Sequence, residues 1–141
     1  MCPVFIENIS SDSKIKLLSL KKLAQKILRD FKERGDLNII LVSDGYMKKL
    51  NQKFTRRKRT TDVLSFGFRE KDTLKGKGTF LGEVYISVDK AINQAEDYRV
   101  PFEQELKRLV AHGVLHLLGY EHKNKKDQER MREKEEEYIF S

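Results

Sequence analysis

Short apolar runs alternate along the chain with longer segments in which apolar residues recur at every third or fourth position. The runs are typical of strands, and we expect four of them, at residues 3–8, 37–42, 61–68 and 80–88. The longer segments predict amphipathic helices. Together they indicate an α+β fold in which helices pack against a single mixed sheet of about four strands. The order of the strands cannot be read from the pattern.

Polar residues and proline predict where the helices begin. The expected starts are, in chain order, residues 11–13, Ser43 with Asp44, Asp89, and Val100 with Pro101. Gly35 is expected to close the first helix, and a charged helix is expected from about residue 125 to residue 140. Gly82 lies inside a predicted strand, which marks a bulge or a close approach of another segment.

Basic residues outnumber acidic ones, 29 against 22, so the chain carries a formal charge of +7. This excess favours an anionic partner such as nucleic acid, with a charge-rich solvated surface as an equal alternative. No apolar run is long enough to cross a bilayer, and the N-terminus lacks the pattern of a signal peptide. Cys2 is the only cysteine, which excludes an intramolecular disulfide. We expect one cytoplasmic domain over residues 1–141, without a membrane partner.

The densest positive stretch of the chain is KFTRRKRT at residues 53–60. Its phosphate-binding candidates are Lys53, Arg56, Arg57, Lys58 and Arg59. The alternative is a flexible, solvated loop. Phe54 is expected to pack in the core because it follows a predicted helix, and stacking on a base is its alternative role.

All three histidines of the chain lie within eleven residues, in the order H-x3-H-x5-H. On a helix, His112 and His116 lie one turn apart on the same face. Gly119 can end that helix through a positive φ, so the chain can turn back and bring His122 to the same point. Three imidazoles suit a zinc ion with a fourth position open for water, or another divalent transition metal. The alternative is three solvated histidines near a helix end.

This zincin-like three-histidine spacing also matches the metzincin protease pattern H-E-x-x-H-x-x-G-x-x-H, with one departure. Gly113 stands where those proteases carry the glutamate that activates water. The zinc geometry can therefore be shared while the reaction differs. A metalloprotease-like hydrolase and a non-catalytic assembly factor with a structural zinc remain the alternatives to a metal-dependent nuclease.

Several separate blocks resemble the YbeY family of metal-dependent endoribonucleases. The blocks are HGVLHLLGYEH at 112–122, TDVLSF at 61–66, LGEVYIS at 81–87 and QAE at 94–96, and Glu105, Met131 and Glu135 also fit. The similarity runs in the same order over residues 37–139. Its specificity comes from the agreement of several unrelated blocks.

The resemblance implies one zinc-like ion on His112, His116 and His122. It also implies cleavage of single-stranded RNA in maturation of the 3′ end of small-subunit rRNA and in ribosome quality control, with ribosomal proteins and the GTPase Era as partners. The family arginine thought to support activity falls at Thr55 in the ungapped register, and the sequence does not say which neighbouring arginine replaces it.

Two routes of cleavage are open on chemical grounds. A metal-bound water of lowered pKa is the first candidate nucleophile, and the 2′-hydroxyl of the RNA is the second. Glu121 precedes His122 and is a candidate for orienting water or a ligand imidazole. A solvated turn residue is an equally good interpretation of Glu121.

Overall fold

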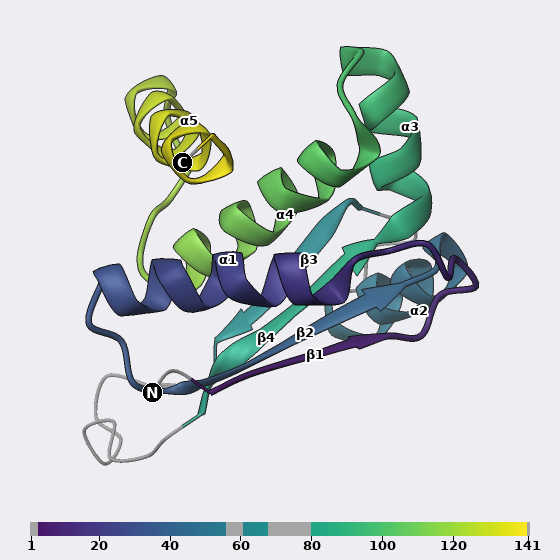
Figure 1. The fold of residues 1–141 in the computed structure, drawn as a ribbon, viewed down its shortest axis with the longest axis horizontal. Coiled ribbons are helices and arrows are strands. Elements are labelled where there is room, and N and C mark those ends of the chain that lie inside the picture. Colours follow the sequence, from purple (N-terminus) through teal and green to yellow (C-terminus); the bar gives the residue numbers. More distant parts are fainter. Residues whose placement is uncertain (1–2, 56–60, 68–79, 141) are drawn as a thin grey trace.

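The computed structural model describes residues 3–55, 61–67 and 80–140. One four-stranded sheet runs through it, in the order β1-β2-β4-β3 (Figure 1). Its strands are β1 (Val4–Asn8), β2 (Asp36–Val42), β3 (Val63–Gly67) and β4 (Phe80–Ser87). The pairs β1–β2 and β2–β4 are parallel, whereas β3 and β4 are antiparallel. The prediction of a single mixed sheet in an α+β fold is confirmed.

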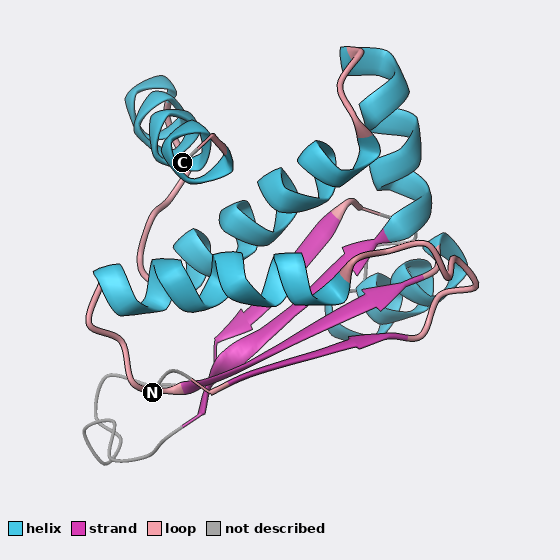
Figure 2. Cartoon of the chain, in the orientation of Figure 1, coloured by secondary structure: helices cyan, strands magenta, loops and turns pink. Residues whose placement is uncertain are grey.

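The helices cover the sheet unequally (Figure 2). They are α1 (Leu17–Asp30), α2 (Asp44–Thr55), α3 (Val88–Tyr98), α4 (Phe102–Leu117) and α5 (Lys125–Ile139). α1 and α4 lie side by side on one face of the sheet, and α5 packs against α4 farther from the sheet (Figure 1). α2 lies on the opposite face, where Tyr46 stacks on Tyr85 with ring centroids 6.5 Å apart. In the described residues, no helix is long and apolar enough to cross a membrane.

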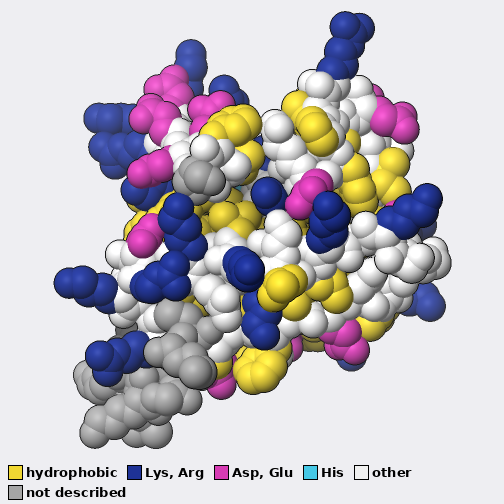
Figure 3. Space-filling model, in the orientation of Figure 1, with side chains coloured by type: hydrophobic (Ala, Val, Ile, Leu, Met, Phe, Trp, Pro, Cys, Tyr) yellow, Lys and Arg dark blue, Asp and Glu magenta, His cyan; other side chains and the backbone are white. Residues whose placement is uncertain are grey.

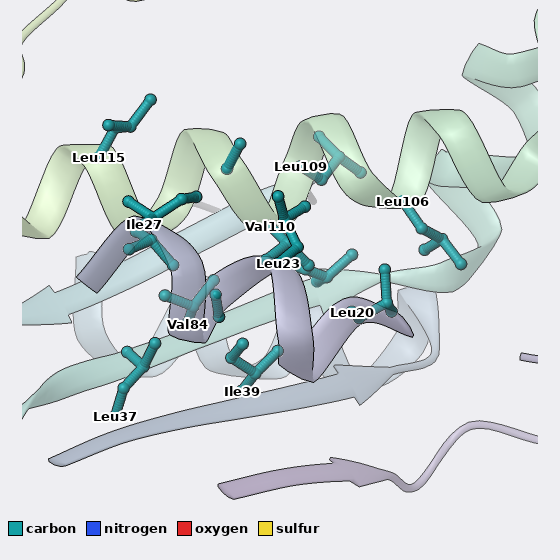
Figure 4. Close-up of a cluster of buried hydrophobic side chains, with 14 of the residues drawn as sticks. Leu20, Leu23, Ile27, Leu37, Ile39, Val84, Leu106, Leu109, Val110 and Leu115 are labelled. Atoms are coloured by element: carbon teal, nitrogen blue, oxygen red, sulfur yellow. The ribbon is translucent and has the colours of Figure 1, made fainter. Parts of the chain in front are cut away.

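The core fills the space between the sheet and the pair α1–α4 (Figure 4). The alternation along β2 explains this: Leu37, Ile39 and Leu41 are buried, while Asn38 and Ile40 between them are partly exposed. Each helix contributes an apolar stripe of period 3.6, which includes Leu20, Leu23 and Ile27 on α1 and Leu106, Leu109 and Val110 on α4. Hydrophobic burial therefore fixes α4 against the sheet.

Helix boundaries differ from the predictions at both ends of α1 and at the starts of α3 and α4. α1 ends at Asp30, with Phe31 as its C-cap, and not at Gly35. α1 begins at Leu17 rather than near residues 11–13, because the Asp12 carboxylate accepts a bond from Lys14 N (2.9 Å) and holds a turn before the helix. α3 is capped by Ser87, whose Oγ accepts from Lys90 N at 3.2 Å, and not by Asp89. Pro101 is the N-cap of α4 and lies just before the first turn.

Two other local predictions are confirmed. Ser43 Oγ accepts a hydrogen bond from Tyr46 N at the start of α2 (3.2 Å). Gly82 is a site of close approach, because a Cβ there would collide with the Phe66 carbonyl oxygen and press on Leu117 of α4. The contact lets the C-terminal half of α4 lie directly on β3 and β4.

Candidate functional site

Gly113 sets the height and rotation of α4 above the sheet. A Cβ at this position would lie 2.5 Å from Val84 Cγ1 and 3.2 Å from Ser65 Oγ. Ser65 Oγ also donates a hydrogen bond to the Gly113 carbonyl (3.2 Å). Position 113 therefore faces the sheet and has no room for a side chain. The glutamate of the zinc proteases does not fit there, which argues further against the protease alternative.

The turn after α4 returns the chain towards the helix. Gly119 has a φ of +109°, its N–H donates to His116 O (3.1 Å), and Tyr120 N–H donates to Leu115 O (3.0 Å). This pair of bonds is a Schellman motif, in which a glycine reverses the chain without a steric penalty. The predicted positive φ at Gly119 is thus confirmed.

The three histidine rings lie next to one another. The His122 ring centroid is 5.5 Å from that of His112, at an interplanar angle of 28°, and 5.7 Å from that of His116, at 31°. His112 is half-buried, whereas His116 and His122 are exposed. The fold therefore brings together the three residues that the spacing singles out, at the surface where α4 ends.

Glu135 of α5 fixes the His112 ring. Its Oε2 lies 2.6 Å from His112 Nδ1, and the glutamate side chain is only 7% exposed. An ionised carboxylate can only accept, so the proton lies on Nδ1 and the lone pair of the neutral ring lies on Nε2. This carboxylate–histidine pair is the usual way in which a protein orients an imidazole for a metal.

Arg108 holds Glu135 and joins it to α3 and α4. Its Nη1 lies 3.8 Å from Glu135 Oε1, and its Nη2 donates to the buried Glu105 (2.6 Å) and to Gln94 Oε1 (3.4 Å). Gln94 Nε2 donates in turn to Asp62 Oδ2 (3.2 Å), just before β3. Because its partners come from α3, α4 and α5, Arg108 fixes the position of α5 relative to the histidines.

The surroundings of His116 favour the neutral form of its ring. Neighbouring atoms shield part of its ring from water, and this desolvation, followed by the charges that His122 and His112 would carry, lowers its pKa below the usual 6.5. Its lone pair is therefore available at neutral pH, as a metal ligand requires.

The donor set suits a zinc-like ion in its chemistry. It consists of imidazoles from two helical turns and a loop, one of them oriented by a carboxylate. As the side chains stand, no three His, Cys, Asp or Glu residues within the described ranges are grouped closely enough to hold a metal ion. The His122 ring lies flat beside its neighbours, and it is exposed on a turn, so it can rotate without disturbing the core.

Of the other predicted site residues, Glu121 lies beside the histidines, Lys53 lies apart from them, and the rest lie outside the described ranges. Glu121 is exposed and forms an ion pair with Lys123 (3.3 Å), although its charge also acts to raise the pKa of His116. Lys53 lies in the last turn of α2 on the opposite face of the sheet, with its ammonium 5.4 Å from the centroid of the Phe54 ring. Residues 56–60, which include Arg56, Arg57, Lys58 and Arg59, lie outside the described residues.

The prediction that Phe54 packs in the core is wrong. Its side chain is 57% exposed and meets Phe66 edge-on, with ring centroids 5.3 Å apart. α2 covers only part of its face of the sheet, so the last turn of the helix lies beyond the core. The apolar ring is therefore only partly removed from water.

A model of the family described as endoribonuclease YbeY matches residues 5–141. The chain belongs to the YbeY family. This is a family of nucleases, so RNA is the substrate class that membership implies. The resemblance in the sequence blocks is thereby confirmed.

Similar proteins cover most of the chain. An endoribonuclease YbeY of Flavobacterium psychrophilum is 40% identical over 80% of this chain and 76% of its own length. One of Syntrophotalea carbinolica is 37% identical over 95% of this chain and 91% of its own. The solution structure of a Thermotoga maritima protein covers 96% of this chain and 86% of its own, with 34% identity and a TM-score of 0.69.

Glu135 is the site residue that sequence reasoning did not assign. It fits the YbeY-like closing helix, but nothing in its neighbourhood links it to His112, which lies 23 residues earlier. The one feature that could have indicated its role was its position on the apolar side of α5, where Met131 and Tyr138 are also buried. A glutamate in such a stripe needs a partner.

Proposed function

We propose that this chain is a zinc-dependent endoribonuclease that cleaves single-stranded RNA. Its substrate would be the 3′ end of small-subunit rRNA, with a further role in ribosome quality control and with ribosomal proteins and the GTPase Era as partners. The observation that carries the proposal is the meeting of His112, His116 and His122 at the end of α4, in a chain of the YbeY family.

His112, His116 and His122 would hold the ion, which would supply a Lewis acid and a water of lowered pKa when bound. The chain itself contributes orientation. Glu135 keeps the proton of His112 on Nδ1 and leaves Nε2 as the donor atom. The lowered pKa of His116 keeps that ring unprotonated. Glu121 beside His122 is the candidate for orienting a water molecule at the open position.

Substrate binding would rest on phosphate contacts from the basic stretch that begins at Lys53, with Arg56, Arg57, Lys58 and Arg59 as its other members. Replacing Arg56, Arg57 and Arg59 by alanine should weaken RNA binding. It should also flatten the salt dependence of binding, because fewer counterions would be released. Unchanged binding across salt concentrations would contradict this role.

The deciding experiment combines metal content with RNA cleavage. Purified protein is assayed for bound metal and for cleavage of a single-stranded fragment of small-subunit rRNA precursor, with and without a chelator. His116→Ala is purified and assayed beside it, because a contaminating nuclease would be equally active in both preparations. We expect cleavage to require the metal and to disappear in the variant.

A folded His116→Ala protein that cleaves RNA at the wild-type rate would exclude metal catalysis at this site. A protein that contains stoichiometric zinc but cleaves no RNA would favour the non-catalytic assembly factor. A strand with 2′-deoxy sugars separates the two nucleophiles, since only attack by water survives the loss of the 2′-hydroxyl.

A further inference from the structure

A groove leads away from the histidines between α5 and the pair α3–α4. Its first part, of about 170 Å³, is walled by His112, His122 and Arg132. Its second part, of about 410 Å³, reaches Tyr98 and Ile139. Both parts share Arg108, Arg132 and Glu135 and are therefore adjacent; we call them together the α5 groove. In Figure 3 the surface is hollowed between α5 and α3.

Arg132 is the cation that the α5 groove offers to a ligand. The guanidinium of Arg108 is committed to Glu105 and Glu135, and Glu135 is committed to His112. Arg132 is exposed, and no ion pair joins it to any residue that the structure describes. A planar guanidinium in this position is suited to a phosphate.

Tyr98 is an aromatic surface at the far end of the groove. It is 58% exposed, and the Arg108 guanidinium carbon lies 5.8 Å from the centroid of its ring. Because Arg108 is itself held by three side chains, it fixes one side of Tyr98 while much of the ring faces water. Ile139 lines the same cavity from α5. A flat apolar group can therefore enter between the two walls.

We infer that the α5 groove binds the single-stranded RNA next to the cleaved bond, with a phosphate on Arg132 and a base stacked on Tyr98. The inference rests on the proposed function and names the path of its substrate. A cation followed by an exposed ring is the usual arrangement for a single strand. The second part of the groove has the size of pockets that hold small ligands, about 300–1,000 Å³, so a nucleotide fits there.

One carboxylate of the groove opposes this ligand. Glu136 is exposed and lines the second part, whereas Glu135 is already paired. Repulsion from Glu136 would weaken contact with a phosphate at Arg132. Replacing Glu136 by glutamine should therefore tighten RNA binding and not merely leave it unchanged.

The test uses the full chain as purified and a fluorescent single strand of 2′-O-methyl RNA, checked on a gel to remain intact. Fluorescence anisotropy gives the Kd at several salt concentrations for wild type, Tyr98→Ala and Arg132→Gln. Tyr98→Phe keeps the ring. Tyr46→Ala and Arg29→Gln are the matched controls, since they remove an exposed tyrosine from the opposite face of the sheet and an exposed arginine from α1. Circular dichroism confirms that each variant is folded.

We expect Tyr98→Ala to weaken binding about 5-fold or more, as loss of one base stack does, and Tyr98→Phe to bind like wild type. Arg132→Gln should lower the slope of log Kd against log salt by about 0.7, the value for one phosphate contact to a single strand. The two control variants should bind like wild type.

If both groove variants keep the wild-type affinity and salt slope while the protein still binds and cleaves RNA, the inference that RNA binds in the α5 groove is wrong. The proposed function would then stand. An equal change in Arg29→Gln would also overturn the inference about the groove, because the loss would then not be specific to the groove. A wild-type protein that neither binds nor cleaves RNA would remove both proposals.

Discussion

At the scale of single residues, the site depends on a hydrogen bond that α4 cannot make for itself. His112 is half-buried, and its Nε2 is left with the lone pair because Glu135 accepts a hydrogen bond from Nδ1–H. This hydrogen bond favours ligand binding because the His112 imidazole is already oriented and loses little conformational freedom when a ligand binds. The contact is short, at 2.6 Å, and largely shielded from water, so it is stronger than a surface ion pair.

Glu135→Gln should weaken zinc binding by about 10- to 100-fold, the usual effect of changing a group that orients a metal ligand. The amide oxygen still accepts from Nδ1, but the negative charge that polarises the ring is gone. Competition with a chromophoric chelator measures the affinity without any need for RNA. Glu133→Gln on the exposed side of α5 is the control. Equal zinc affinity in all three proteins would leave Glu135 with a purely structural role.

Gly113→Ala should destabilise the fold by about 1–3 kcal/mol through overpacking. The new methyl group would meet Val84 Cγ1 at 2.5 Å, on a strand that cannot retreat from the core. Gly45→Ala in α2 is the matched change, because its Cβ finds Ser43 Oγ only at 4.0 Å and helix propensity favours alanine. Denaturant unfolding compares the two. Equal stability of the two variants would show that β4 shifts to make room for the new methyl group.

The sequence predicts the histidines but not their support. His112, His116 and His122 are recognisable because they are every histidine in the chain and their spacing suits one helix and a turn. Glu135 and Arg108 act across the α4–α5 contact, which depends on how two helices pack. No local sequence pattern encodes the distance between α4 and α5. The steric role of Gly113 likewise depends on the sheet beneath it and cannot be predicted from its neighbours in the sequence.

At the scale of elements, the short turn after α4 decides whether the third imidazole meets the other two. The Schellman bonds at Gly119 and Tyr120 satisfy the last carbonyls of the helix and reverse the chain within a few residues. A longer or looser turn would place His122 over a wide range of positions. The turn is therefore part of the site as much as the helix is.

Gly119→Ala should cost about 1–2 kcal/mol, because an L residue resists a φ of +109° while the space around the position is open. Gly119→Asn should cost less, since asparagine tolerates positive φ. Thermal unfolding gives the order of stability, and zinc affinity should follow the same order as the turn becomes less defined. Alanine and asparagine variants that are equally stable would show that the turn adopts another conformation.

Elements were easier to predict than their ends. The apolar periods locate all four strands and the described helices, because burial of one face dictates each period. The starts of α1 and α3 were misplaced, because several polar residues compete to cap each helix. Ser87 takes the cap of α3, while the Asp89 carboxylate accepts a bond from the backbone N–H of Asp44 (2.7 Å).

At the scale of the whole molecule, α5 is tied to distant parts of the chain at both sides. Tyr138 Oη donates to Asp30 Oδ2 of α1 (2.8 Å), and Glu135 contacts α4. The strand order β1-β2-β4-β3 could not be predicted, since parallel pairing is decided by which helices cross between strands. The sheet and α1 thus provide the frame that positions α5 over the histidines.

Alkaline titration should reveal two tyrosines that ionise late. Burial, followed by the hydrogen bond with Glu83, raises the pKa of Tyr85 from 10.0 to about 12, and burial followed by the bond to Asp30 also raises the pKa of Tyr138. The chain has five tyrosines and no tryptophan, so tyrosinate absorbance reports them directly. Tyr85→Phe and Tyr138→Phe should each remove one late step. A single transition of all five near pH 10 would contradict both contacts.

The sign of the stability change follows from these pKa values. The folded chain keeps the Tyr85 proton at a pH where the unfolded chain has released it. The contribution of the protonated Tyr85 hydroxyl to the free energy of unfolding is therefore complete below about pH 10. It is lost as the pH rises from about 10 to about 12. Denaturant midpoints measured through this range should fall less steeply for Tyr85→Phe than for wild type.

The placement of Glu135 so late in the chain has a consequence for synthesis. A ribosome makes the chain from its N-terminus, so β1 to α4 and all three histidines are completed before α5 exists. Until then His112 lacks its carboxylate, and the contact between Tyr138 and Asp30 must bridge a separation of 108 residues. A nascent or truncated chain would thus carry all three histidines without the orientation that makes them a site. We expect such a chain to bind zinc more weakly than a chain in which α5 has been made.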